Sequence, residues 1–157
     1  MALSICENFH LFAMANHIEK KLNLLSDYLT FGINTLDLHN EKFYKLLEEL
    51  RIYSITKENS AVIQEILNEF EAYSVYHFEV EECMMQACNF YNTEQHIEHH
   101  QFFIKKIQEF KQLFRYGNTV ADVQILNFVR KWFVVHISEM DKNFADFYKI
   151  KNKQFAE

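Results

Sequence analysis

Apolar residues recur along most of this chain at the three- and four-residue spacing of amphipathic helices. In residues 36–53 they lie on one face, and charged residues occupy the other. The spacing repeats in residues 60–88 and 93–115, and from 119 or 122 to 149. The predicted inward stripes are Leu36, Phe43, Leu47 and Leu50; Ile63, Leu67, Phe70, His77, Glu81, Met84 and Cys88; His96, His100, Phe103, Ile107, Phe110 and Phe114; and Val129, Phe133, Ile137, Met140 and Phe144.

Helix signals and breakers define the predicted architecture. Ser60 and Thr93 are suitable N-caps, Gly117 is a suitable C-cap, and Thr119 or Asp122 opens the last helix. The chain has no proline and only two glycines, which leaves little room for the turns of a β protein. Short connections make successive helices antiparallel neighbours. We therefore predict an all-α, up-down-up-down four-helix bundle.

The predicted domain organisation is one bundle with short extensions. The bundle spans residues 25–150. Residues 1–24 form an N-terminal arm, for which a short helix is one option, and residues 151–157 form a C-terminal tail.

Composition excludes several classes of protein. The 157-residue chain has a formal net charge of −6, and no basic face is visible for a nucleic-acid partner. No apolar run approaches the roughly 20 residues of a membrane span. The N-terminus lacks a basic region and carries Glu7 and His10, which argues against a signal peptide. Three cysteines without a CxxC pair favour a reducing cytoplasm.

An acidic residue lies in the apolar stripe of the second predicted helix. Glu81 falls near the centre of that stripe, with His77 one turn away, whereas Glu79 and Glu82 fall outside it. A buried, unpaired carboxylate costs many kcal/mol or stays protonated. A positive or strongly hydrogen-bonding group must therefore face Glu81.

Two other helices supply such groups. His96 and His100 share the inward face of the third helix, and His136 and Asp141 flank the apolar stripe of the fourth. One histidine on an apolar face is usually an ordinary core residue, and one His-x-x-x-His pair is a weak signal. Three helices each direct a pair of potential metal ligands toward the same interior. This combination indicates a metal site. Imidazole and carboxylate without thiolate suit iron or manganese, with zinc possible, and two carboxylates suit a dinuclear site.

Three ordered motifs resemble those of one protein family. His-Phe-x-x-Glu-Glu-x-x-Met occurs at 77–85, His-x-x-x-His followed by Phe at 96–103, and Trp-x-x-x-His-Ile-x-x-x-Asp at 132–141. Residues 31–37 resemble the family's lead-in to its first helix. Over about residues 28–148 the chain resembles the single-domain hemerythrins of bacteria, whose fold is a bundle of the same topology.

The resemblance implies a metal centre and a function. It implies two non-haem iron ions bridged by Glu81, Asp141 and an oxo or hydroxo group. His96, His100 and His136 would hold one iron and His77 the other. Reversible binding of O2, for storage, delivery or protection, is favoured over an enzyme. A diiron enzyme acting on O2, peroxide or nitric oxide, and an oxygen or redox sensor with a separate partner, stay open as alternatives.

The first helix departs from the family pattern. The family carries Asp-x-x-His there, and this chain reads Asp37-Leu38-His39-Asn40, so that the family position falls on Asn40. The apolar residues that follow favour Asn40 in that position. Chemistry favours His39, because imidazole is a better iron ligand than an amide. We predict His39 as the further metal ligand, with Asn40 as the alternative.

Overall fold

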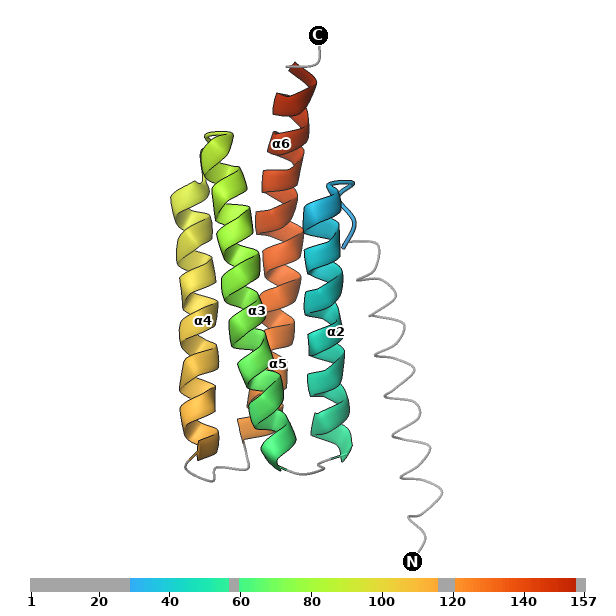
Figure 1. Cartoon of the computed structure of the whole chain (residues 1–157), viewed down its shortest axis with the longest axis vertical. Coiled ribbons are helices and arrows are strands. Elements are labelled where there is room, and N and C mark those ends of the chain that lie inside the picture. The colour runs from blue at the N-terminus through green and yellow to red at the C-terminus, as the bar shows by residue number, and fades with distance from the viewer. Residues whose placement is uncertain (1–28, 57–59, 116–120, 155–157) are drawn as a thin grey trace, which may run out of the picture.

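The computed structural model describes residues 29–56, 60–115 and 121–154. These residues form four antiparallel helical rods, which confirms the predicted all-α bundle (Figure 1). The last rod runs without a break through two α-helices and a π-helical turn. The elements are α2 (Asn34–Thr56), α3 (Ser60–Ala87), α4 (Thr93–Arg115), α5 (Ala121–Val135), η1 (His136–Asp141) and α6 (Lys142–Gln154).

The rods are arranged as the short connections predict. α2 contacts α3 and α5, and α4 contacts α3 and α5, so that each rod packs beside its neighbours in sequence and the last closes on the first. Helix α6 continues to Gln154, past the predicted end at Lys149. The predicted arm 1–24, Gly117 and Thr119 lie outside the described residues.

The start of α2 is fixed by one carboxylate. Asp37 accepts hydrogen bonds from the backbone N–H of Phe31 at 2.6 Å and of Gly32 at 3.0 Å. Gly32 has a φ of 70°, a conformation that favours glycine. The lead-in segment is thereby tied to the first turn of α2, which sets the rotation of the residues that follow.

The end of α3 also has a defined stop. Asn89 adopts a φ of 52°, and the N–H of Phe90 donates to the carbonyl of Met85 at 2.9 Å. This pairing across a left-handed residue is the Schellman arrangement, which satisfies carbonyls left open at a helix end. The Thr93 hydroxyl then donates to the Phe90 carbonyl at 2.7 Å. The tight turn returns the chain directly into α4.

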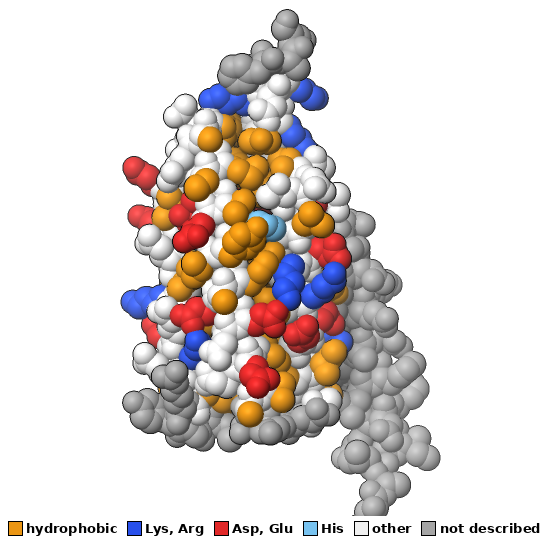
Figure 2. All heavy atoms as spheres, in the orientation of Figure 1, with side chains coloured by type: hydrophobic (Ala, Val, Ile, Leu, Met, Phe, Trp, Pro, Cys, Tyr) orange, Lys and Arg blue, Asp and Glu red, His pale blue; other side chains and the backbone are white. Residues whose placement is uncertain are grey.

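Aromatic side chains fill much of the core. The rings of Phe43 and Phe133 stack with centroids 4.7 Å apart, and those of Phe103 and Trp132 are 4.3 Å apart. Burying such rings supplies most of the favourable free energy of folding. In the face that Figure 2 shows, hydrophobic side chains run lengthwise between acidic and basic ones. None of the described helices is long and apolar enough to cross a membrane.

Candidate metal centre

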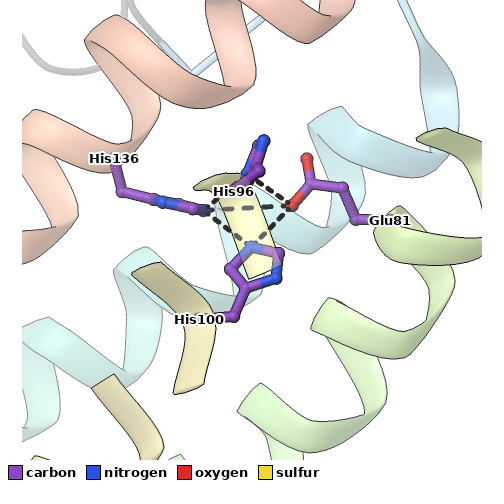
Figure 3. A group of neighbouring side chains, drawn as sticks. All are labelled: Glu81, His96, His100 and His136. Atoms are coloured by element: carbon purple, nitrogen blue, oxygen red, sulfur yellow. Dashed lines mark hydrogen bonds and ion pairs between the residues drawn. The ribbon is translucent and has the colours of Figure 1, made fainter. Parts of the chain in front are cut away.

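Three imidazoles and one carboxylate converge between α3, α4 and η1 (Figure 3). The Nε2 atom of His136 lies 3.4 Å from Nε2 of His96 and 3.2 Å from Nε2 of His100. Glu81 Oε2 lies 3.5 Å and 3.3 Å from the Nε2 atoms of His96 and His100. An ion about 2.0–2.1 Å from each nitrogen would hold such atoms about 3.0–3.4 Å apart. The observed spacing is therefore that of a metal-ligand set.

A second cluster adjoins the first. Ligand atoms of His77, Glu81 and Asp141 all lie within 4.8 Å of one another. Glu81 belongs to both clusters, and Asp141 Oδ1 is 2.9 Å from His136 Nε2 and 3.4 Å from His96 Nε2. Both carboxylates thus lie between the three imidazoles of the first cluster and the single imidazole of His77, where each carboxylate can contact two ions.

The buried carboxylates test whether a metal fits this site. Glu81 is 0% exposed and Asp141 1% exposed. All four of their carboxylate oxygens lack a hydrogen-bond partner within the described part of the chain. Their nearest charged neighbours are imidazoles, which balance a carboxylate only when they are protonated, and a cation supplies the missing interactions. The donor set of imidazole and carboxylate, with no thiolate in either cluster, fits iron or another first-row ion.

A π-helical turn brings the last two ligand candidates onto one face. In an α-helix, residues five apart lie about 140° apart around the axis. In η1 the N–H of Lys142 donates to the carbonyl of Ile137, the five-residue spacing of a π-helix. The wider turn brings Asp141 back beneath His136, and both are 1% exposed. It also turns Met140 partly into solvent, so the prediction of Met140 in the apolar stripe was wrong.

A second layer of side chains holds the imidazoles in place. Glu82 Oε1 lies 2.8 Å from His100 Nδ1, and the His100 ring stacks on Phe78 with centroids 3.9 Å apart. Metal-bound histidines commonly donate their second ring N–H to a carboxylate in this way. Sequence reasoning placed Glu82 outside the stripe and missed this contact. Glu82 lies one helical turn after Phe78, and this spacing was the sequence signal that could have placed Glu82 beside α4.

His99 backs the imidazole of His136 and was also missed. Its Nδ1 lies 3.1 Å from His136 Nδ1, and Trp132 stacks on the His136 ring with centroids 4.2 Å apart. His100 lies in the predicted inward stripe, whereas His99 lies 100° away from it around the helix and was therefore not predicted to face the site. Together the two neighbours fix the orientation of the His136 ring.

The electrostatics of the metal-free site are those of a preformed cation site. Burial alone would raise the pKa of Glu81, but the imidazoles of His100, His136 and His96 hold this pKa well below its ordinary value. Burial disfavours protonation of His96, yet Asp141 and Glu81 outweigh it and raise its pKa to about 9. Glu81 is therefore ionised, and the protonated imidazole of His96 supplies part of the positive charge that a metal ion would supply.

A comparison with known families agrees with this geometry. Residues 32–148 match the model of the hemerythrin HHE cation binding domain. The chain belongs to the hemerythrin family. The match covers the described helices as far as residue 148 and every residue of the two clusters.

Several hemerythrins resemble the chain over most of their length. The bacteriohemerythrin of Stenotrophomonas maltophilia is 28% identical over 130 residues, covering 83% of this chain and 84% of that one. A hemerythrin-like protein of Naegleria gruberi is 27% identical over 131 residues, covering 83% and 97%. The fold agrees with a solved point mutant of hemerythrin, at a TM-score of 0.65 and 24% identity over 71% of this chain and 85% of that chain.

The two candidates on α2 have different surroundings. His39 is 9% exposed, and its Nδ1 lies 3.0 Å from Nδ1 of His77. It belongs to neither of the two ligand clusters found among the described residues. Asn40 is 1% exposed, and neither atom of its amide has a hydrogen-bond partner there. Ligation of iron by His39 stays a prediction.

The stability of the metal-free hemerythrin fold should depend on pH through His77. Burial lowers the pKa of His77 to about 4, against the opposing charges of Glu81 and Asp141 and with smaller effects of His136 and His39. Below pH 6.5 the unfolded chain therefore binds a proton that the folded chain does not. As the pH falls from 6.5 to 4, this group should remove up to about 3 kcal/mol from the free energy of unfolding.

Urea unfolding in the presence of a chelator measures this effect. The variant His77→Gln is the control, because glutamine does not titrate in this range while the other groups are retained. The wild type should lose more stability than His77→Gln between pH 6.5 and 4. Equal losses would show that His77 is not buried in its neutral form.

Proposed function

We propose that this chain is a non-haem diiron protein that binds O2 reversibly, for storage, delivery or protection. The observation that carries the proposal is that two ligand clusters share Glu81, so that two ions can be held side by side. One ion would have three imidazole ligands, and the other ion would have one imidazole ligand. The two carboxylates would be shared between the ions. The proposed ligands are His96, His100 and His136 at one ion, His77 at the other, and Glu81 and Asp141 shared between the two.

The ligand set supports iron with open coordination at one ion. Two ferrous ions held there would supply electrons to O2 at a vacant coordination position and recover them on release. The cluster around His77 offers fewer protein ligands than the cluster around His136, so an ion held by His77 would be the one left open to O2. The two buried carboxylates balance part of the charge of the ions.

Aromatic side chains fill the core that adjoins this centre, where Phe78 stacks on the His100 ring. Phe43, Phe70, Phe103 and Phe133 are each at most 1% exposed. A site closed to water and protons favours release of O2 over its irreversible reduction. The predicted inward positions of these four rings are confirmed. Three cysteines without a CxxC pair support a reducing compartment such as the cytoplasm.

Oxygen titration of the reduced, iron-loaded protein tests the proposal. Visible absorption is recorded anaerobically, after admission of O2 and again after purging with argon. We expect new absorption bands that appear with one O2 for each pair of irons and disappear on purging, over repeated cycles. The same chain loaded with zinc is the control and should show no bands.

Two outcomes would overturn the proposal. Continued consumption of O2 beyond one molecule for each iron pair, in the presence of a reductant, would identify an enzyme. Purified protein that contains stoichiometric zinc and takes up no iron would remove the basis for O2 binding altogether.

A further inference from the structure

Helix α2 carries two consecutive buried polar residues, His39 and Asn40, and they make different contacts. The His39 ring lies edge-on to the His77 ring, with centroids 5.0 Å apart and an angle of 89° between the ring planes. Tyr76 lies beside the same ring, with centroids 5.3 Å apart. His39 therefore sits between α2 and α3, against a proposed ligand and beside a tyrosine that is 56% exposed.

The contact between His39 and His77 commits one nitrogen of each ring. Two Nδ1 atoms 3.0 Å apart can share one proton, with one ring donating and the other accepting. A histidine that binds a metal through Nε2 carries its proton on Nδ1 and donates it to a neighbouring acceptor. If His77 is such a ligand, its Nδ1–H donates to Nδ1 of His39.

Asn40 lies on the inward stripe of α2. It is four residues after Leu36 and three before Phe43, and these two side chains are each 1% exposed. Neither the oxygen nor the nitrogen of its amide meets a hydrogen-bond partner among the described residues. A buried polar group left without a partner destabilises the folded state. Within the described part of the chain, the amide of Asn40 is thus a buried ligand candidate without a hydrogen-bond partner.

We propose that Asn40 is the residue of α2 that binds the second ion, through its amide oxygen, and that His39 is a positioning residue for His77. This inference rests on the proposed diiron function. It departs from the imidazole that the resemblance places in the first helix. The two ions then differ strongly in their ligands: three imidazoles hold one ion, whereas one imidazole and one amide hold the other beside the shared carboxylates. A weaker donor set leaves the second ion less tightly bound and its vacant positions more accessible.

Proton NMR of the ferrous protein counts the imidazole ligands directly. Each imidazole bound to a paramagnetic ion through Nε2 keeps an N–H whose signal is shifted far outside the ordinary range and disappears in D2O. The proposal gives the wild type four such signals, from His77, His96, His100 and His136. A fifth signal in the wild type would identify His39 as a ligand and overturn the proposal.

Two variants of His39 test its positioning role. At saturating ferrous ion, His39→Ala should keep four shifted signals, while the affinity for the second ion falls roughly 10- to 100-fold, the effect of losing an outer-shell partner. His39→Gln should recover much of that affinity, because its amide oxygen can accept the same N–H. Loss of one signal in His39→Ala, with two ions still bound, would overturn the proposal.

Two variants of Asn40 test its place at the ion. Asn40→His should add a fifth shifted signal and tighten the second ion. Asn40→Leu, which has a similar shape but no donor, should keep four signals and weaken the second ion alone. If Asn40→His adds no signal and Asn40→Leu leaves both affinities unchanged, Asn40 does not face the ion. Wild-type protein that binds fewer than two ions would instead refute the proposed function, so the two failures are distinguishable.

Discussion

Glu81→Gln is expected to lose most of its bound iron. Glu81 is the residue shared by both ligand clusters, and its two oxygens lack hydrogen-bond partners in the described structure. A neutral amide neither bridges two cations nor balances their charge. The loss of affinity should therefore exceed the roughly 10- to 100-fold effect of removing an outer-shell partner. Iron is measured per chain after anaerobic loading and desalting, together with the visible spectrum of the oxidised protein.

Glu79→Gln is the matched control for this change. Glu79 lies on the same helix, is exposed, and loses the same charge. It should keep two irons for each chain and an unchanged spectrum. Circular dichroism of Glu81→Gln should remain that of a helical bundle, which separates loss of metal from loss of fold. If Glu81→Gln kept both irons and its spectrum, Glu81 would not bind the metals.

Removal of the metal is expected to destabilise the folded chain by several kcal/mol. The folded bundle holds the proposed ligand side chains together, and the unfolded chain does not, so that bound ions should stabilise the folded state by mass action. At a free ion concentration 1,000 times the dissociation constant, the stabilisation is about 4 kcal/mol. Urea unfolding followed by circular dichroism, with ferrous ion under nitrogen and then with a chelator, measures this difference.

The same measurement on Glu81→Gln separates specific from general effects of the ion. That variant should unfold at nearly the same urea concentration with ferrous ion and with chelator. In the wild type, coincident curves under the two conditions would show that the metal is not bound to the folded state. Metal binding would then not be coupled to folding of this chain.

The sequence by itself determined the four helices and most of the inward-facing residues. Helix α4 begins at Thr93 and ends at Arg115 as predicted, because the apolar spacing that defines a helix acts locally. The inward positions of Glu81, His96 and His100 follow from the regular 3.6-residue period of an α-helix, which holds throughout α3 and α4. Local rules were sufficient wherever the helix stayed regular.

The sequence predicted Asp141 beside the inward stripe, but only the tertiary structure decided the π-helical turn that puts it on one face with His136. An α-helix would have left Asp141 and His136 on different sides of the last rod, and the sequence contains no simple signal for a π-helical turn. Such a turn has poorer backbone geometry than an α-helix, so it persists only where contacts elsewhere in the fold stabilise it. The packing of η1 against the site supplies those contacts, and Met140 is turned outward as a consequence.

The roles of His39 and Asn40 were likewise beyond the sequence. An ideal helix places the two residues on opposite sides of the apolar stripe, so periodicity cannot choose between them. The choice depends on how α2 is rotated against α3, which is set by the packing of the two helices. The contact of His39 with His77 and the open amide of Asn40 exist only once the two helices are docked.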